Sequence, residues 1–405
     1  MSPPADPPAV LLGGEAIALS VARSLTRAGV PAHAFGHKHD PLRYSRRRAS
    51  FTSFGDSDDV QARWLERLER DRSRAVLLPC CDDGLELVAR NREALTELGY
   101  IPVEAEDSAI LAMLDKRETY EVARAAGVAA PYTATVSSEV DAASFIERVR
   151  PPWALKPVHS HHFAHHFGLR KKAFIVTDAE ELREPLSRTL ELGIAMVLTE
   201  IIPGPDNAFE SYYSYLDDNG EPLFAFTKRK LRQYPTGFGL GTYHQTDWNP
   251  EVAALGLRFL QAAGVRGLAN VEFKRDSRDG QLKLIECNYR FTAATQLLRA
   301  CGLDLPLFVY RRALGHLGPD LHCYRTGVHL WYPVQDARAF FDYHRRGELT
   351  VGQWARSLKR RQHFPVASWS DPLPTVVHHG RMAARRYRRA MRAERGSQRA
   401  QGSVP

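Results

Sequence analysis

A predicted β-hairpin near residue 280 constrains this chain more than any other feature of its sequence. Two runs of strand-forming residues, Leu268–Lys274 and Gln281–Tyr289, are separated by residues that favour turns. The turn residues are Asp276, Ser277, Asp279 and Gly280. A strand, a polar turn and a second strand predict an antiparallel hairpin with a longer loop.

Two glutamates are predicted to face each other across this hairpin. Side chains alternate between the faces of a strand, so Glu286, Asn288 and Arg290 share one face of the second strand. Glu272 lies an even number of residues before Glu286, with the turn midway between them, so pairing brings the two carboxylates together. Like charges placed this way repel, and Mg²⁺, which prefers oxygen ligands, removes the repulsion. An exposed hairpin with solvated charges is the alternative.

The order of Glu272, Glu286, Asn288 and Arg290 resembles the metal-binding hairpin of the ATP-grasp superfamily, which includes biotin carboxylase, carbamoyl-phosphate synthetase and the D-alanine and D-aspartate ligases. The resemblance implies that the two glutamates and the asparagine hold Mg²⁺ or Mn²⁺ against the phosphates of ATP, with Arg290 near the reacting groups. It also implies an α/β (α+β ATP-grasp) fold, with an N-terminal Rossmann-like domain, a two-lobed ATP-grasp domain and a C-terminal extension.

The first hundred residues indicate a small parallel α/β domain. A strand at 10–12, Gly13-Gly14 and a helix ending at Gly29 form a strand–turn–helix unit. Further strands are expected at 31–35 and 75–79, and Asp82 and Asp83 are expected to cap the helix that follows. Dinucleotide binding is the alternative for the paired glycines, but Glu15 occupies the helix start where a phosphate would bind.

Two lysines match the positions at which the family contacts ATP. Lys116 follows Asp115 near the start of a predicted helix, and Lys156 ends the short strand in PPWALKP. The resemblance implies that both lysines bind the nucleotide phosphates. For Lys116 the alternative is a solvated lysine on a helix. A lysine that leaves a buried strand, like Lys156, is poorly placed unless it meets an anion.

The loop after Lys156 departs from the family. ATP-grasp loops here are glycine-rich, whereas this one reads VHSHHFAHHFGLRKK and contains five histidines. We favour a phosphate lid that uses imidazole donors backed by basic residues, and a zinc or nickel site is the alternative. The histidines are His159, His161, His162, His165 and His166, and the basic residues are Arg170, Lys171 and Lys172.

A buried strand at 194–199 leads to the segment that resembles the family's hinge between lobes. The resemblance implies that the backbone of Glu200, Ile201 and Ile202 pairs with adenine. Asp206 or Asn207 is implied to contact the ribose, and neither match is unique.

A basic run precedes the second lobe's loop. TKRKLRQYPTGFGLG carries Lys228, Arg229, Lys230 and Arg232 ahead of several glycines and prolines. Cationic side chains beside a flexible loop suit phosphate and carboxylate ligands. The resemblance implies that Lys230 takes part in catalysis, and a surface hairpin with scattered charges is the alternative.

Composition excludes several other classes. No apolar run is long enough to cross a membrane, and the first ten residues lack the regions of a signal peptide, so we expect a cytoplasmic protein. Residues 376–405 contain eight arginines and one glutamate, which accounts for nearly all of the chain's formal charge of +8. A solvated tail is favoured for this segment, with contact to an anionic membrane as the alternative. No nucleic-acid-binding fold accompanies the charge.

The sequence therefore predicts an ATP- and Mg²⁺-dependent ligase that joins a carboxylate to an amine or thiol through an acyl phosphate and releases ADP. A nucleotide-binding regulator without turnover and a metal-binding protein are the competing hypotheses, and a homodimer is left open. The predicted organisation places an α/β domain at 1–110, a small lobe at 111–200, a large lobe at 201–315, an accessory extension at 316–375 and a basic tail at 376–405.

Overall fold

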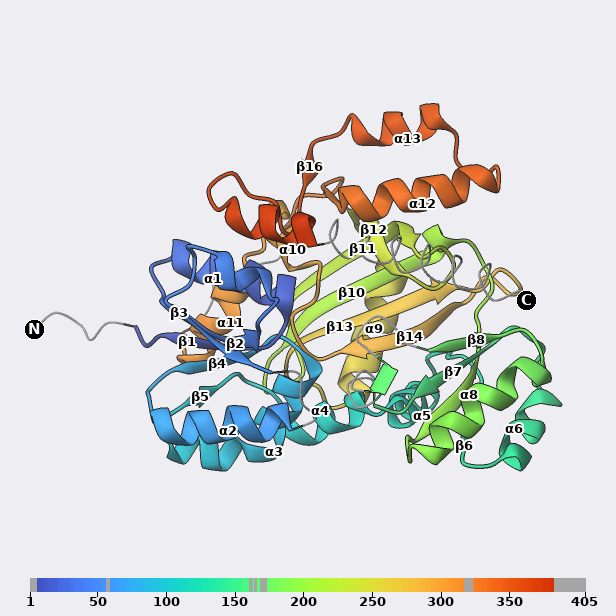
Figure 1. Ribbon diagram of the computed structural model, residues 1–405, viewed down its shortest axis with the longest axis horizontal. Coiled ribbons are helices and arrows are strands. Elements are labelled where there is room, and N and C mark those ends of the chain that lie inside the picture. The colour runs from blue at the N-terminus through green and yellow to red at the C-terminus, as the bar shows by residue number, and fades with distance from the viewer. Residues whose placement is uncertain are drawn as a thin grey trace, which may run out of the picture.

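The computed structural model describes residues 6–55, 59–159, 163, 166–167, 173–316 and 323–381. Three β-sheets form the frame of these residues, and helices cover each of them (Figure 1). The predicted α/β class, with both parallel and antiparallel sheets, is confirmed.

The N-terminal sheet is fully parallel, in the strand order β3-β2-β1-β4-β5. Its central strands are continuous apolar runs because both faces of a parallel sheet are covered by helices. The strands are β1 (Ala9–Leu12), β2 (Ala32–His37), β3 (Ser50–Phe54), β4 (Val76–Pro79) and β5 (Ile101–Pro102). The covering helices are α1 (Glu15–Arg27), α2 (Val60–Asp71) and α3 (Asp82–Glu97), with a 3₁₀ turn η1 (Pro41–Tyr44).

The turn after β1 requires glycine for packing reasons. Gly14 has a left-handed backbone (φ 95°), and a Cβ added there would lie 2.3 Å from the Cβ of Cys80. The two glycines thus let α1 approach the end of β4. This close contact accounts for the glycine pair without a bound phosphate.

The predicted caps of α3 are wrong. The N-cap is Cys81, whose sulfur accepts a hydrogen bond from the backbone of Gly84. Asp82 is the first residue of the helix, and its carboxylate pairs with Arg290, more than two hundred residues away in the sequence. The side chain of Asp82 is therefore directed toward Arg290, which comes after the second strand of the predicted hairpin.

The second sheet is antiparallel and has the order β6-β9-β7-β8. Its strands are β6 (Thr133–Val136), β7 (Trp153–Pro157), β8 (Phe174–Val176) and β9 (Met196–Glu200). It packs against α6 (Glu139–Ile146) and α8 (Ala179–Glu191) around a separate apolar core that includes Phe145, Trp153 and Leu198. Two further helices, α4 (Asp107–Leu114) and α5 (Lys116–Ala125), connect it to the N-terminal sheet.

The third sheet is the largest, in the order β14-β13-β10-β11-β12-β15-β16. Its strands are β10 (Phe209–Leu216), β11 (Pro222–Tyr234), β12 (Leu240–Asp247), β13 (Gly267–Arg275), β14 (Leu282–Asn288), β15 (His329–Trp331) and β16 (Gln362–His363). The associated helices are α9 (Pro250–Ala262), α10 (Thr295–Cys301), α11 (Leu305–Ala313), α12 (Pro333–Arg345), α13 (Val351–Leu358) and the 3₁₀ turn η2 (Asp206–Ala208).

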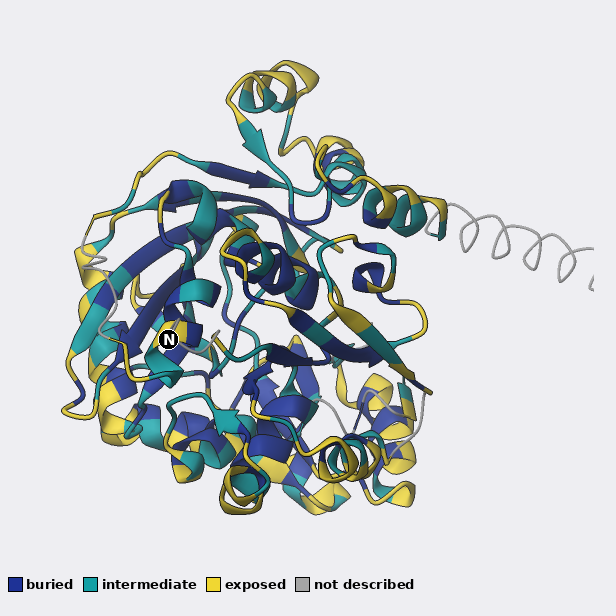
Figure 2. Ribbon diagram, turned by 90° about the vertical axis from the view of Figure 1, so that its left-hand side faces the viewer, coloured by how far each residue is buried: buried dark blue, intermediate teal, exposed yellow. Residues whose placement is uncertain are grey.

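The two faces of the large sheet pack against different partners. On one face Tyr212 and Val271 contact α9 and α5. On the other face Tyr215 packs edge-to-face on Phe308 of α11, and both join the core of the N-terminal domain. This core covers only one end of that face, so polar residues occupy the remainder. Figure 2 shows that the sheets themselves are largely buried, whereas exposed residues are on the outer helices.

The segment after α11 is joined to the large sheet through a buried carboxylate. Asp336 of α12 is fully buried and forms an ion pair with Arg232 of β11 at 2.7 Å. It also accepts hydrogen bonds from Thr242 and from the indoles of Trp331 and Trp354. Strands β15 and β16 extend the sheet itself. The predicted accessory extension is therefore built into the large lobe.

A second long-range ion pair ties the end of the described chain to its beginning. Arg23 of α1 and Asp371 are both buried, and the guanidinium meets the carboxylate at 3.0 Å. Ser45 donates to the same carboxylate at 2.6 Å. Residues 373–381 are helical, and Arg381 donates to the hydroxyl of Tyr44. The rest of the predicted basic tail, from 382 onward, lies outside the described residues.

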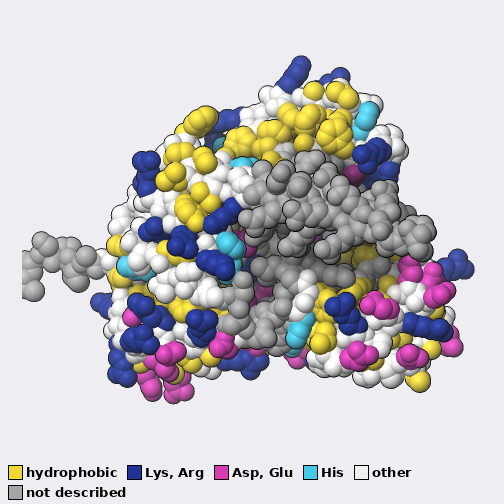
Figure 3. Space-filling model, viewed as in Figure 1, with side chains coloured by type: hydrophobic (Ala, Val, Ile, Leu, Met, Phe, Trp, Pro, Cys, Tyr) yellow, Lys and Arg dark blue, Asp and Glu magenta, His cyan; other side chains and the backbone are white. Residues whose placement is uncertain are grey.

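No helix in the described ranges combines the length and the apolar character that a membrane crossing requires. Exposed apolar side chains do occur over the upper part of the molecule in Figure 3, where α12 and α13 lie. Phe341 of α12 and Val351 of α13 are exposed apolar residues.

Candidate active site

Glu272 and Glu286 stand directly opposite each other on β13 and β14, as predicted. The register near the turn pairs Phe273 with Leu284, so an undistorted ladder would place Ile285 opposite Glu272. The register shifts by one residue at this point and leaves Ile285 as a bulge. The hydroxyl of Tyr120 from α5 donates to the Ile285 carbonyl at 2.9 Å. A bulge, rather than a symmetric turn, thus brings the two carboxylates together.

The remaining residues of the predicted metal hairpin lie beside this pair. The amide nitrogen of Asn288 donates to Glu286 at 3.2 Å. Arg290 follows β14 and donates to Asp82 at 2.5 Å. The carboxylate of Asp82 raises the pKa of the buried Arg290 guanidinium despite the cost of burial. The N-terminal domain therefore positions the arginine that sequence reasoning placed near the reacting groups.

The predicted basic run divides between two places. Lys228 and Lys230 are buried on the large sheet and lie near Glu272. Lys230 donates to Glu272 at 3.1 Å, and Lys228 donates to the hydroxyl of Ser211 at 3.0 Å. The β11–β12 register shifts just after Lys230, and Arg232 pairs with Asp336 instead. The register shift thus separates Arg232 from the two lysines of the run.

Burial lowers the pKa values of Lys228 and of the nearby His244. It lowers the pKa of Lys228 to about 8, with a further contribution from Lys230, and the nearby Glu272 opposes that change. His244 of β12 lies opposite Lys230 in the register. Burial and the two lysines lower the pKa of His244 well below its usual value. The imidazole of His244 is therefore neutral at pH 7. Lys228 is mostly protonated at pH 7 and loses its proton as the pH rises through about 8.

We predict that the affinity for MgATP falls above pH about 8. Lys228 carries its positive charge below its pKa of about 8 and loses it as pH rises, so its attraction for phosphate is lost in that direction. Lys228→Arg should move this loss beyond the measurable range, because a guanidinium stays protonated. Calorimetric titration of MgATP between pH 6.5 and about 9.5 measures the effect. Lys359→Arg, at an exposed position, is the control, and an unchanged pH profile in Lys228→Arg would contradict the assignment.

The structure brings the first predicted ATP lysine to the strand that carries the second. Lys116 begins α5 after the N-cap Asp115, and its ammonium donates to the carbonyl of Val158 at 3.4 Å. Lys156 lies on β7, two residues before Val158. Of the histidine-rich loop, His161, His162, His165, Arg170, Lys171 and Lys172 lie outside the described residues. Neither the lid nor the metal alternative is tested there.

The predicted adenine hinge follows β9. The backbone nitrogen of Glu200 donates to Tyr132, and its side chain pairs with Arg278. Ile201 is half-buried, and the carbonyl of the buried Ile202 accepts a hydrogen bond from Lys274 at 2.8 Å. Lys274 projects from β13, the strand that carries Glu272. The hinge and the carboxylate pair are thereby connected through one strand.

Asp206 has protein partners of its own. Its carboxylate accepts hydrogen bonds from Gln233 at 2.7 Å, from the backbone of Gly237 and from the hydroxyl of Tyr343 at 2.6 Å. These contacts hold the loop between β11 and β12 against α12. Asp206 thus positions this loop. Its contact with the ribose of ATP stays a prediction.

Sequence reasoning missed several polar residues on the functional face. Ser211, His244 and Asn270 were not selected, although each lies on a strand next to a selected residue. In the register, Ser211 pairs with both Glu272 and Lys228. Asn270 pairs with Asn288. Buried polar residues at alternate positions of otherwise apolar strands were the available signal.

The geometry fits a divalent cation at the glutamate pair. Two carboxylates on adjacent strands repel unless a cation lies between or beside them, and Lys230 donates to only one oxygen of Glu272. Among the described residues, no group of three or more His, Cys, Asp and Glu side chains could hold a metal ion alone. Two carboxylates and an amide are a donor set that suits Mg²⁺ when phosphate oxygens complete its shell.

Comparison with known proteins identifies the family. No family model matches the chain. The chain is 30% identical to the D-aspartate ligase of Enterococcus faecium (strain Aus0004) over 316 residues. The matched region covers 74% of this chain and 75% of that protein. The chain belongs to the ATP-grasp ligases.

Solved structures of ATP-grasp ligases share the fold. The biotin carboxylase domain of Hydrogenobacter thermophilus 2-oxoglutarate carboxylase, solved with MgADP, ADP and bicarbonate, superposes with a TM-score of 0.61 at 17% identity, covering 79% of this chain and 73% of that one. The L-amino acid ligase of Bacillus licheniformis gives 0.58 at 15%, covering 78% and 76%. This ATP-grasp ligase is thus an ATP-dependent enzyme of the class that forms carbon–nitrogen bonds.

Proposed function

We propose that this ATP-grasp ligase joins a small carboxylic acid to an amine through an acyl phosphate and releases ADP. The observation that carries the proposal is the cross-strand pair Glu272–Glu286, with Lys228 and Lys230 on β11 of the same sheet, one strand beyond β10. Carboxylates that can hold a cation and ammonium groups that can hold phosphate lie on one sheet. This is the charge arrangement that phosphoryl transfer to a carboxylate requires.

The proposed reaction has two steps. An oxygen of the substrate carboxylate attacks the γ-phosphorus of ATP, the bond to the bridging oxygen breaks, and ADP leaves with that electron pair. The amine nitrogen then attacks the acyl carbon, an amide forms, and inorganic phosphate leaves while the nitrogen loses a proton. The protein contributes positioning and charge neutralisation rather than a covalent bond.

Each residue has a proposed role. Glu272, Glu286 and Asn288 would hold Mg²⁺, which neutralises phosphate charge when bound. Lys116 and Lys156 contact ATP phosphates from the small lobe. Their positions near the end of β7 support this role, because Lys116 reaches a backbone carbonyl just after that strand.

Two cationic groups are proposed to act on the reacting atoms. Lys230 lies 3.1 Å from Glu272 and would stabilise the transferring phosphoryl group. Arg290, held by Asp82, would bind the substrate carboxylate or the charge that develops on the acyl group. The backbone of Glu200, Ile201 and Ile202 is proposed to face adenine, and Asp206 the ribose.

The similarity to a D-aspartate ligase directs the choice of acids. Amino acids with a side-chain carboxylate, such as D- and L-aspartate, are the first candidates for the activated acid. Peptides and amino acids with a free amine are the first candidates for the acceptor. The solvated arginine-rich tail stays a prediction, and its membrane contact and a homodimer stay open alternatives.

The reaction is tested through its nucleotide product. We expect ADP, and a hydroxamate when hydroxylamine replaces the amine, only in mixtures that contain the correct acid. Mass spectrometry with amine pools then identifies the acceptor. Reactions without acid and reactions with EDTA are the controls.

Two results would contradict the proposal. AMP as the nucleotide product would indicate adenylation instead of phosphoryl transfer. ATP binding without turnover across broad acid and amine pools would favour a nucleotide-binding regulator.

A further inference from the structure

A pocket at the edge of the large lobe is lined by several positively charged side chains. It has a volume of about 170 Å³ and lies where α10 meets the loop before β15 and the strand β16. Its lining residues are Ala300, Arg325, Gly327, Val328, Arg360, Arg361 and His363. Strand β16 is at the opposite edge of the sheet from β14, which carries Glu286. The pocket is therefore separate from the candidate active site.

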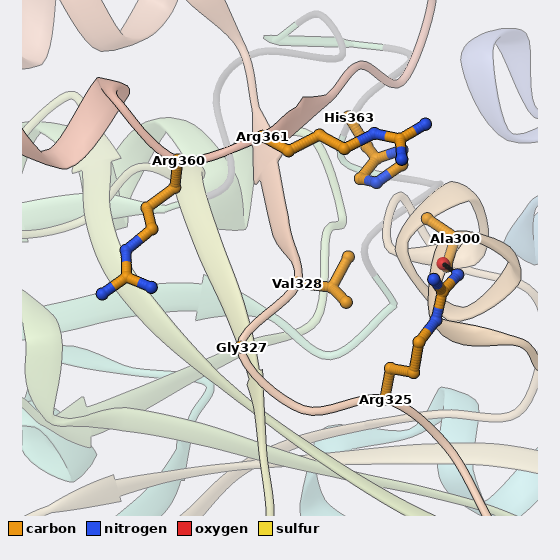
Figure 4. Close-up of a pocket in the computed structure, with 7 residues that line it drawn as sticks. All are labelled: Ala300, Arg325, Gly327, Val328, Arg360, Arg361 and His363. Atoms are coloured by element: carbon orange, nitrogen blue, oxygen red, sulfur yellow. Dashed lines mark hydrogen bonds between the residues drawn. The ribbon is translucent and has the colours of Figure 1, made fainter.

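Three basic side chains are directed to one side of this pocket. In Figure 4, Arg361 extends toward the ring of His363, and Arg325 rises beside Ala300 below them. Arg360 points away on the other side of the pocket. Burial lowers the pKa of His363, and the positive charges of Arg361 and Arg325 lower that pKa further. Because Arg325, Arg361 and His363 all line this one pocket of about 170 Å³, they can contact a single ligand within it.

Arg325 is fixed in position by the end of α10. Its guanidinium donates to the carbonyl of Ala300 at 2.5 Å, and its backbone nitrogen donates to the carbonyl of Cys301 at 3.0 Å. The carbonyl end of a helix attracts a cation. His363 is held by the pairing of β16 with β15. Arg325 and His363 are thus placed before any ligand binds, and the exposed Arg361 precedes β16.

The charge in the pocket has no carboxylate partner among the described residues. Arg325, Arg360 and Arg361 form no ion pair there, whereas Arg23, Arg232 and Arg290 each pair with an aspartate. Cations placed close together repel, and an anion would remove this cost. Figure 4 also shows Val328 between the basic groups, where it offers an apolar floor.

We propose that Arg325, Arg361 and His363 form a binding site for a phosphate group. Guanidinium groups bind phosphate through two parallel hydrogen bonds. Three donors that approach from different directions match the several oxygens of a phosphate, whereas one guanidinium already satisfies a carboxylate. The phosphate is either free or part of a phosphomonoester whose organic part lies on Val328.

The full-length protein with ¹³C-labelled histidine provides the test. The resonance of His363 is assigned by its loss in His363→Gln, and inorganic phosphate is titrated in at constant ionic strength. We expect a saturable shift of this resonance. Arg361→Ala should weaken binding about tenfold, the loss of one charge-assisted contact, and Arg361→Lys should weaken it less. Arg258→Ala, an exposed residue of α9 on the opposite face of the sheet, should leave binding unchanged.

Parallel titrations identify the source of the phosphate. Equal affinity for inorganic phosphate and ribose 5-phosphate indicates free phosphate, and tighter binding of ribose 5-phosphate indicates a phosphomonoester. Acetate should bind far more weakly than either. A shift that does not saturate, or one that Arg361→Ala and Arg325→Lys leave unchanged, or an equal affinity for acetate, would overturn the proposal.

Discussion

Replacing Glu286 with glutamine is expected to lower the rate of ADP formation by about three orders of magnitude, because a bound metal supplies several kcal/mol of charge stabilisation. The change removes a negative charge with almost no change in volume. Glu286 is exposed on β14, so the fold should be retained. Glu272 would then face a neutral amide while it keeps its contact with Lys230. We therefore expect lost metal affinity rather than lost stability.

The measurement combines turnover with metal dependence. ADP release is followed at increasing Mg²⁺ with the acid found by the hydroxamate screen, and circular dichroism monitors folding. Glu97→Gln, at an exposed position of α3, is the matched control and should behave as wild type. Normal turnover at normal Mg²⁺ in Glu286→Gln would defeat the assignment of the carboxylate pair.

Replacing Asp336 with alanine is expected to destabilise the large lobe by about 3–5 kcal/mol, the usual cost of removing one partner of a buried ion pair. The fully buried carboxylate accepts hydrogen bonds from Arg232, Thr242, Trp331 and Trp354. Alanine would leave the guanidinium of Arg232 buried without its counter-ion. Urea denaturation followed by tryptophan fluorescence should report the loss, since two indoles contact this carboxylate.

Two further variants separate charge from packing. Asp342→Ala lies on the same helix outside this network and should change stability by less than about 0.5 kcal/mol. Arg232→Met combined with Asp336→Leu removes both charges and should recover much of the loss. If Asp336→Ala unfolds at the wild-type urea concentration, the network is not what joins α12 to the sheet.

Local patterns were sufficient to predict the hairpin and the pairing of its two glutamates. Alternation along two strands and a polar turn placed Glu272 opposite Glu286, and the register agrees. The register shift at Ile285 could not be predicted from local patterns, because the carbonyl of Ile285 is contacted by the hydroxyl of Tyr120 from a helix far away in the sequence. Paired apolar runs and glycine turns likewise predicted the N-terminal sheet.

Long-range pairs explain what sequence reasoning missed. Asp82 had the position of a helix cap, and only the fold shows that it meets Arg290. Arg232 belonged to a basic run, yet a register shift directs it to Asp336. The partners of Asp82 and Arg232 lie about one hundred or two hundred residues away, where no local periodicity connects them.

The ion pair between Arg23 and Asp371 has a consequence for the order in which the chain folds during synthesis. These residues are separated by 348 positions, so α1 leaves the ribosome long before its buried partner exists. Domains generally fold in order from the N-terminus as they emerge. The first domain must therefore either hold Arg23 in water or fold around an unpaired guanidinium until residue 371 has been synthesised. A shortened chain that stops before residue 371 would stay in that state permanently, whereas one that stops after 381 would retain the pair.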